Sequence, residues 1–530
     1  MSDARALPAR SAPAARTGGL SYRYLVLIVV ILGAFISILD TTITNIAIPK
    51  LEAVFGVDLN TAQWVINAYT LALTVSIPFF GWLADRIGTK RTYMIVLAGF
   101  TGASALCGLA WSNTALVGFR VLQGLGGGAL LPLGTALIFA EFAPHERGQA
   151  IALLGVPILF APALGPTVGG YLVDYVDWRL IFYINVPIGI TALILAANVL
   201  RPGGAKANAR LDVPGLICAS SGFSLVTYGV TLSESDGWDA LSTRGFLGAG
   251  ALFLIALVIV ELNVAQPLLD VRLLKNRAFT SGLLVGALIQ AVLFGGTFLV
   301  PVFLQNLRGQ TAFQAGLILL PAALVTVVVL PFGGRLVDVI GAKWVIVMGA
   351  VVLAAANYLM SHLSLAVPFA LLQLWLALRS VALGLSAQPA QVAAFAEIPR
   401  EILSRASAFY NVLTRVASAF GVSFLTSYLG QQQKVHYAHL AEQVTPLSPI
   451  GQAITGAIQQ AQFNGTDVRL AQAQTARAVI GQLQGQAALL SFRDTFIVVT
   501  FMALFAALVA LIVMPPVKRR SPTGEPVIAE

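Results

Sequence analysis

The stretch LDTTITNIAIP, residues 39–49, ends the first long apolar run of the chain and places a carboxylate, Asp40, within it. A charge at that depth in a membrane costs about 3 kcal/mol or more, so such residues are mostly kept where they face a wet interior and have a function. Protonation removes the charge and deprotonation restores it, which makes Asp40 a candidate proton carrier. The alternative is that Asp40 lies near the membrane surface and caps a helix end, although Ile43 to Ile48 continue the apolar pattern.

The composition of the 530-residue chain is that of a polytopic membrane protein. Hydrophobic residues make up 57% of it and charged residues 10%, with a mean hydropathy of +0.83, whereas soluble proteins carry about 25% charge. The net charge of +9 does not indicate a nucleic-acid partner, because the basic residues are spread over short loops between apolar runs. Cys107 and Cys218 lie in apolar runs and the four histidines lack ligand spacing, so we expect no disulfide framework, metal site or cofactor.

Fourteen apolar runs are long enough to cross a bilayer as helices, which takes about 20 residues each. No segment alternates as the strands of a transmembrane β-barrel do, so the predicted fold class is all-α. The runs lie near 22–46, 61–84, 92–111, 114–139, 148–172, 179–200, 211–232, 243–263, 279–305, 313–337, 343–361, 366–392, 404–428 and 492–514.

An even number of spans puts both termini on the same side of the membrane. The Lys and Arg residues of the connecting segments gather on that side, for example in 86–91 and 272–277, which predicts that both termini are cytoplasmic. Residues 1–21 are then a disordered cytoplasmic N-tail, and 515–530 are a cytoplasmic C-tail.

An internal repeat divides the chain into two similar halves. GWLADRIGTKR (81–91) recurs in weakened form as GRLVDVIGAKW (334–344), and FAEFAPHERGQA (139–150) recurs as FAEIPREILSRASA (395–408). A repeat in the same order predicts two six-helix bundles related by an axis along the membrane normal, and the two surplus spans form an inserted hairpin between them. The predicted domains are 22–200, 211–263 and 279–514.

The segment 429–490 is a long, Gln- and Ala-rich stretch on the side opposite the termini. Ser448 and Pro449 have the pattern of a helix start, and Asn464-Gly465 is a turn signal. We expect an extracytoplasmic helical hairpin here; the alternative is an irregular polar loop.

Four motifs resemble those of the major facilitator superfamily, specifically its fourteen-span drug:proton antiporters of the EmrB/QacA type. Residues 81–91 match the loop motif G-x3-D-R-x-G-x-K/R, and 120–127 match the fourth-span motif R-x2-Q-G. Residues 155–170 resemble the antiporter motif that ends G-P-x2-G-G, and 39–49 resemble the first-span motif, with Thr44 where Val is more usual. The matching residues are Gly81, Asp85, Arg86, Gly88, Lys90, Arg91, Arg120, Gln123, Gly124, Gly127, Gly155, Pro162, Gly165, Pro166, Gly169 and Gly170.

This resemblance implies a major-facilitator fold and a bacterial inner-membrane exporter of lipophilic or amphipathic drugs. It would be driven by the proton-motive force and would work by alternating access, with protons and membrane lipids as its other partners. The long loop 429–490 is similar to that of the branch that works with a periplasmic membrane-fusion adaptor and an outer-membrane channel. Neither catalytic residues nor a nucleic-acid partner is implied.

Three groups of residues are candidates for the transport machinery. Asp40 and Arg120 are expected to communicate across the first bundle as the proton-coupling pair; alternatively, Arg120 clamps carbonyls of neighbouring helices. Asp85 is expected to pair with a basic residue across the boundary between the bundles and to act as a gate. The alternative is that this loop motif only forms the turn and sets the orientation of the chain in the membrane. The predicted gating set is Gly81, Asp85, Arg86, Gly88, Arg91 and Asp338. The predicted hinge, in the fifth span, is Gly165, Pro166, Gly169 and Gly170, for which simple packing is the alternative.

Polar and aromatic residues of the spans are candidates for a central substrate cavity, although each of them could instead be a packing residue. Arg415 could attract an anionic or zwitterionic group or could cross-link helices. The scarcity of acids within the spans, apart from Asp40, weakens the case for divalent cationic substrates. The candidate cavity residues are Asn45, Trp64, Tyr69, Gln123, Gln290, Phe294, Gln305, Gln388, Asn411 and Arg415.

Two other functions remain open at this point. The chain could export one specific natural product, lipid or fatty acid, which the sequence does not separate from multidrug export. A membrane assembly scaffold with 429–490 as its docking arm is the alternative from another class, and the buried charges argue against it. An enzyme is not expected.

Overall fold

The computed structural model describes residues 21–515, except 58, 144–145, 203–210, 265–266, 400–401 and most of 445–467. The described part is helical, without strands. The predicted tails 1–21 and 515–530 lie almost wholly outside the described residues. The all-α fold class is confirmed.

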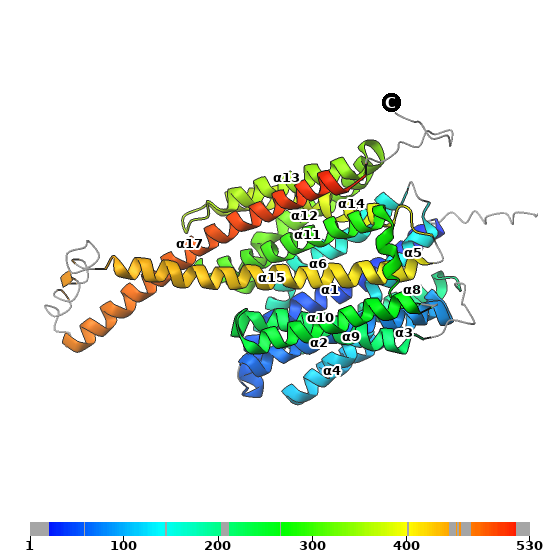
Figure 1. Cartoon of the computed structure of the whole chain (residues 1–530). Coiled ribbons are helices and arrows are strands. Elements are labelled where there is room, and N and C mark those ends of the chain that lie inside the picture. The colour runs from blue at the N-terminus through cyan, green and yellow to red at the C-terminus, as the bar shows by residue number, and fades with distance from the viewer. Residues whose placement is uncertain are drawn as a thin grey trace, which may run out of the picture.

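The first half of the chain forms a bundle of helices (Figure 1). The predicted span 114–139 consists of two helices, α4 and α5, because three consecutive glycines, 126–128, interrupt it. A Cβ on Gly126 would collide with the backbone of Phe100, so these glycines let α4 pack closely on α3. The helices are α1 (Tyr22–Phe55), α2 (Leu59–Ile87), α3 (Thr89–Gly108), α4 (Asn113–Gly127), α5 (Leu130–Glu141), α6 (Arg147–Tyr175), α7 (Leu180–Tyr183) and α8 (Asn185–Val199).

The rest of the chain supplies a hairpin of two helices and then a second bundle. Gly88 and Gly341, in the two copies of the repeated loop, have φ of 91° and 85° and separate successive helices in the same way. The hairpin is α9 (Val213–Asp236) and α10 (Leu241–Asn263), followed by the short helix η1 (Val271–Lys275). The second bundle is α11 (Arg277–Val302), η2 (Phe303–Leu307), α12 (Ala312–Ile340), α13 (Ala342–Met360), α14 (Phe369–Phe395), α15 (Leu403–Glu442) and α17 (Val468–Val513).

Twelve helices of the described ranges are long and apolar enough to cross a membrane. The spans expected at 92–111 and 148–172 are helices as well, α3 and α6, but they are not among these twelve. α3 begins with Lys90 and Arg91 near its start and is rich in Gly, Ser and Thr, which lowers its hydropathy. The prediction of fourteen spans is therefore supported only approximately.

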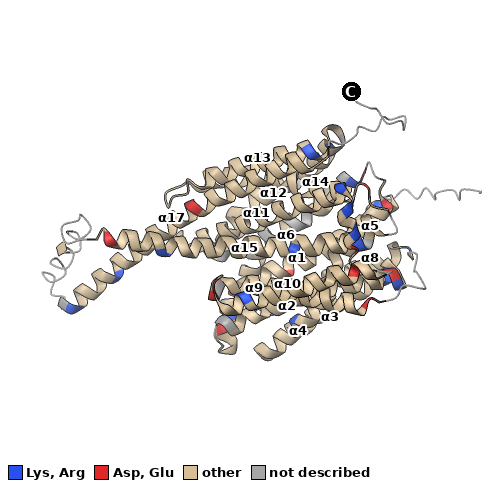
Figure 2. Ribbon diagram, in the orientation of Figure 1, with Lys and Arg blue, Asp and Glu red and all other residues tan. Residues whose placement is uncertain are grey.

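The two ends of the bundle differ (Figure 1). At one end, here called the terminal end, α1 begins and α17 finishes. At the other, the arm end, α15 and α17 project well beyond the other helices as a helical arm. Lys and Arg gather at the terminal end and along the arm, and the middle of the helices is nearly free of charge (Figure 2).

The arm arises because α15 and α17 run past the span limits predicted at 428 and 492. The residues that prolong them are rich in Gln and Ala, which are good helix formers, so the helices continue without a break into the polar segment. The helix start predicted at Ser448-Pro449 and the turn at Asn464-Gly465 lie outside the described residues.

The two bundles are packed together at the terminal end. One hydrophobic cluster includes Phe139 from the first half and Phe279 and Phe395 from the second, with residues of the inserted hairpin such as Phe223. The Ser407 hydroxyl on α15 also donates to the Pro132 carbonyl on α5 at 2.9 Å. Farther towards the arm end, α6 is sandwiched between α1 and α12.

Candidate functional site

The Asp40 carboxylate is fully buried in the first bundle and accepts three hydrogen bonds. Its Oδ2 accepts from Nη1 of Arg120 at 2.5 Å, and its Oδ1 accepts from Nε2 of Gln123 and Nδ2 of Asn185, both at 2.8 Å. The donors lie on α4 and at the start of α8, so the carboxylate joins α1 to two other helices. Three buried protein donors thus satisfy its charge.

Arg120 is equally buried and contacts groups on α1, α2 and α4. Besides Asp40, its Nη1 donates to Oε1 of Gln123 at 2.7 Å, and its Nε donates to the Val65 carbonyl of α2 at 2.9 Å. Its Cζ lies 3.9 Å from the centre of the Tyr69 ring, a cation–π arrangement. Both sequence interpretations of Arg120 thus have a counterpart in the geometry, because it pairs with Asp40 and also holds a carbonyl of a neighbouring helix.

The sequence indicated only part of this cluster. Gln123 and Tyr69 were expected in the substrate cavity, but their contacts with Asp40 and Arg120 place them around that pair. Asn185 was not predicted at all, and neither was Ser104, whose hydroxyl accepts from Gln123 Nε2 at 2.7 Å. The signal available in the sequence was an Asn inside the apolar run 179–200.

A second ion pair crosses the boundary between the bundles at the terminal end. Oδ2 of Asp85, at the end of α2, lies 2.9 Å from Nε of Arg405, at the start of α15. The two side chains are only 9% and 16% exposed. A basic partner for Asp85 in the other half was expected, and Arg405 occupies that place; its gating role stays a prediction.

The other predicted gating residues have different positions. Gly81 faces α15, where a Cβ would contact that of Ala408 at 3.6 Å, and Gly88 makes the turn between α2 and α3. Arg86 and Arg91 are exposed. Asp338 lies near the end of α12, and its side chain is outside the described part of the structure.

The predicted hinge residues line the contact between α6 and α1. A Cβ on Gly165 would overlap the Thr42 side chain, and one on Gly169 would overlap Ile43. The Thr42 hydroxyl also donates to the Ala161 carbonyl at 3.4 Å. Gly170 is buried in the same helix, and the side chain of Pro166 is not described. The glycines therefore bring α6 against the part of α1 that follows Asp40.

The other residues predicted to line a substrate cavity do not share one pocket in the described part of the structure. Some are exposed and others are packed. Asn45 and Gln305 are exposed, Gln290 and Phe294 are partly buried, and Gln388 is buried beside Gly155 of α6. Asn411 donates to the Ser407 carbonyl at 2.8 Å, and Arg415 lies one helical turn farther along α15.

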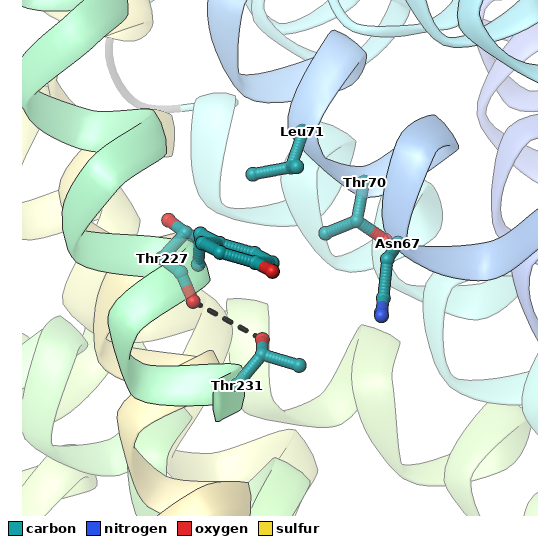
Figure 3. Close-up of a pocket in the computed structure, with 6 residues that line it drawn as sticks. Asn67, Thr70, Leu71, Thr227 and Thr231 are labelled. Carbon is teal, nitrogen blue, oxygen red and sulfur yellow. Dashed lines mark hydrogen bonds between the residues drawn. The ribbon is translucent and has the colours of Figure 1, made fainter. Parts of the chain in front are cut away.

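A small pocket that the sequence did not indicate lies between α2 and the inserted helix α9 (Figure 3). Asn67, Thr70 and Leu71 face Thr227, Tyr228 and Thr231 across it. Trp64, another predicted cavity residue, is close by, with its ring 5.9 Å from that of Tyr228. Trp64 thus packs against the hairpin.

Glu261, near the end of α10, is a second fully buried acid that the sequence interpretation overlooked. Its Oε1 accepts from the backbone N–H groups of Leu268 and Leu269 at 3.2 and 2.9 Å. It therefore fixes the chain segment that leaves the hairpin. The sequence analysis treated Asp40 as nearly the only acid within the spans, and Glu261 is a second one.

Comparisons with known proteins agree with the fold and the motifs. The family model of the Major Facilitator Superfamily matches residues 30–422. The chain is 30% identical to the multidrug export protein EmrB of Escherichia coli K12 over 468 residues, 88% of this chain and 90% of that protein. It is also 30% identical to the riboflavin transporter RibZ of Clostridioides difficile over 414 residues, 78% of this chain and 89% of that protein.

Among solved structures, the proton:xylose symporter XylE superposes with a TM-score of 0.56 at 15% identity, covering 93% of this chain and 96% of XylE. That likeness concerns the fold. The match of the family model over most of the chain and the similarity to EmrB over nearly its whole length lead to one conclusion: this chain belongs to the major facilitator superfamily, in the branch that contains EmrB, and is a multi-pass membrane transporter rather than an enzyme.

Proposed function

We propose that the chain is a proton-coupled exporter of lipophilic or amphipathic compounds and that Asp40 is the group that binds the proton. The observation that carries the proposal is the complete burial of the Asp40 carboxylate together with Arg120 inside a membrane-spanning bundle. A buried ion pair is a poor way to stabilise a protein, because desolvation offsets much of the attraction. Its presence at this depth is better explained by a functional charge change.

Protonation of Asp40 alters the forces within the first bundle. A neutral carboxyl group no longer balances the Arg120 charge, and it has a proton of its own to donate, so the hydrogen bonds at the oxygen that takes the proton must rearrange. A loss of the pair leaves Arg120 with an uncompensated buried charge, which costs several kcal/mol unless the helices shift to provide another partner or water.

The packing of α1 offers a route by which this change reaches the other bundle. Thr42 and Ile43 lie two and three residues after Asp40 and pack against Gly165 and Gly169 of α6. On its other side α6 contacts the second bundle, where a Cβ on Gly316 of α12 would overlap Thr167. A shift of α1 therefore moves the helix that lies between the halves, which is the kind of two-state element that coupling requires.

The Asp85–Arg405 pair and the hydrophobic cluster at the terminal end are the proposed gate. Together they hold the two bundles closed at that end, and they must separate for the bundles to rock about one another. From the distribution of Lys and Arg we place the terminal end, and with it both termini, in the cytoplasm of a bacterial cell. The arm then projects outside, where a periplasmic adaptor could bind it.

The breadth of the substrates is the open part of the proposal. Similarity to EmrB supports export of several drugs, whereas similarity to RibZ, named for one vitamin, supports a transporter of a single compound. A drug-susceptibility panel in an efflux-deficient host separates the two, because a multidrug exporter protects against several unrelated lipophilic compounds and a specific one does not.

The proton role is tested with the purified chain and a compound from that panel. Addition of the compound should release protons from the wild type and none from Asp40→Asn, because the variant has no carboxyl group to empty. Glu52→Gln is the matched control, since it removes a carboxylate from the same helix outside the cluster, and it should release protons normally. Normal release from Asp40→Asn would remove Asp40 from the mechanism.

A further inference from the structure

Three arginines lie deep within the described spans, but only one of them has an acidic partner. Arg120 is paired with Asp40, whereas Arg379 of α14 donates to the Leu293 carbonyl at 2.8 Å and to the Thr297 hydroxyl at 3.0 Å. Arg415 of α15 makes no hydrogen bond or ion pair with any described residue, and its Nη1 is fully buried. Arg379 and Arg415 thus both lack an acidic partner, and Arg415 is the one whose charge is not compensated by neutral acceptors among the described residues either.

The position of Arg415 is central in the membrane. It lies ten residues beyond Arg405 along α15, about 15 Å at the helical rise, which is half the thickness of the hydrocarbon core. α15 also faces α2 of the other bundle, as the Asp85–Arg405 pair shows. The guanidinium is therefore on the boundary between the two halves and near the midplane, where transporters of this kind bind their substrates.

Arg415 is also close to the proposed proton site. The Tyr69 side chain of α2 lies within electrostatic range of Arg415, of Arg120 and of Asp40. Asp40 and Arg120 cancel each other's charge, so the net charge that remains around Tyr69 is the positive charge of Arg415. An unbalanced guanidinium in a low-dielectric environment favours a negatively charged ligand and opposes a positively charged one.

We propose that Arg415 is the recognition site for a single anionic group, such as a carboxylate, on an otherwise apolar substrate. A planar guanidinium binds a carboxylate through charge-assisted, often bidentate, hydrogen bonds. Occupation by a monoanion neutralises the centre, because each of the two arginines near Tyr69 then has one negative partner. This inference rests on the proposed function and narrows it, since it selects lipophilic acids among the amphipathic compounds.

The test is equilibrium binding to the detergent-purified full chain, with three probes that share one naphthyl group and carry a negative, a neutral or a positive head group. The probes are 2-naphthylacetate, its uncharged carboxamide and the quaternary ammonium analogue. The wild type should bind the carboxylate at least tenfold more tightly than the carboxamide, which equals about 1.4 kcal/mol, and the cation most weakly. Arg415→Gln should bind the carboxylate and the carboxamide alike.

Two further variants separate charge from packing. Arg415→Lys keeps the positive charge and should retain a preference for the carboxylate of threefold or more. Arg244→Gln removes one positive charge from an exposed position on α10 and should behave as the wild type. A preference that persists in Arg415→Gln, or that is lost equally in Arg415→Lys, overturns the proposal.

If Arg415→Gln does not purify as a folded protein, the affinities of the wild type for the three probes still test anion recognition. Equal affinity for the carboxylate and the carboxamide then refutes anion recognition. Because these measurements use no proton gradient, their failure is distinct from failure of the proposed function. If the chain prefers the carboxylate but releases no proton, the anion site stands and proton-coupled export is refuted. If it releases protons but shows no preference for the carboxylate, proton-coupled export stands and the anion site is refuted.

Discussion

Replacement of Asp85 by Asn should open the terminal end of the transporter. The substitution leaves a side chain of the same size but removes the negative charge that Arg405 contacts at 2.9 Å. The hydrophobic cluster at the same end remains intact, so the variant isolates the electrostatic part of the closure. Because Asp85 and Arg405 belong to different bundles, their interaction exists only while the bundles are together at this end.

The expected magnitude follows from how far the pair is buried. Breaking a fully buried pair by removing one partner costs about 3–5 kcal/mol, and an exposed pair contributes about 0–1 kcal/mol. At 9% and 16% exposure the Asp85–Arg405 pair lies between these limits, so its loss should destabilise the closed arrangement by about 2 kcal/mol. The ratio of closed to open molecules should then fall roughly 30-fold.

Distance distributions between spin labels would measure that ratio. Lys50 and Leu365 are exposed, lie at the arm end on different bundles and can each carry a label once Cys107 and Cys218 have been replaced by alanine. As the terminal end opens, the arm end should close and the long-distance population should shrink. Asp85→Glu should stay close to the wild type.

An exchange of the two charges, with Asp85→Arg and Arg405→Asp in one chain, should restore much of the wild-type distribution. A population ratio within twofold of the wild type in Asp85→Asn would refute the reasoning, because the pair would then contribute almost nothing to closure.

Three other outcomes are expected. Gly165→Ala should lower the melting temperature and the transport rate, because its Cβ would overlap Thr42 and overpacking costs about 1–3 kcal/mol; Gly102→Ala, which has open space around it, should be neutral in the same thermal assay. Glu261→Ala should destabilise the chain by about 2 kcal/mol or more in thermal unfolding, since two buried N–H groups lose their acceptor, whereas Glu261→Gln keeps an oxygen there and should be far milder. Tyr69→Phe should retain the cation–π contact with Arg120 and transport normally, and Tyr69→Leu should reduce transport; equal activity of the two variants would contradict a role for the ring.

Much of the fold could be predicted from the sequence because hydropathy, loop charge and the internal repeat are local signals. Each predicted apolar run falls on a helix or helices of the structure, and most of the limits agree to within a few residues. α15 and α17 continue beyond the spans predicted at 404–428 and 492–514, since hydropathy records where apolar residues stop, whereas a helix continues as long as its residues favour it. The division of one span into α4 and α5 was likewise missed, although its three glycines were visible.

The candidate site was only half predictable for a related reason. Asp40 and Arg120 stand out in the sequence as charges in apolar runs. Their contact could be predicted once the fold was known, because both lie in the first bundle. Asn185 and Ser104 are ordinary polar residues, and only the packing of α8 and α3 around α1 reveals them as partners. Glu261 was overlooked because it lies at the edge of its run, where an acid normally reaches water.

The inserted hairpin makes the two sides of the transporter unequal. α9 packs on both α2 and α15, with the Ser220 hydroxyl donating to the Val75 carbonyl and the Ser427 hydroxyl to the Ser233 carbonyl. It therefore covers one of the two seams along which the halves meet. In the described part of the chain, α9 and α10 make no comparable contact with α6 or α12 at the other seam. A molecule entering from the surrounding lipid would meet the hairpin on the α2–α15 side and α6 and α12 themselves on the other, which makes the two lateral approaches to the midplane unequal.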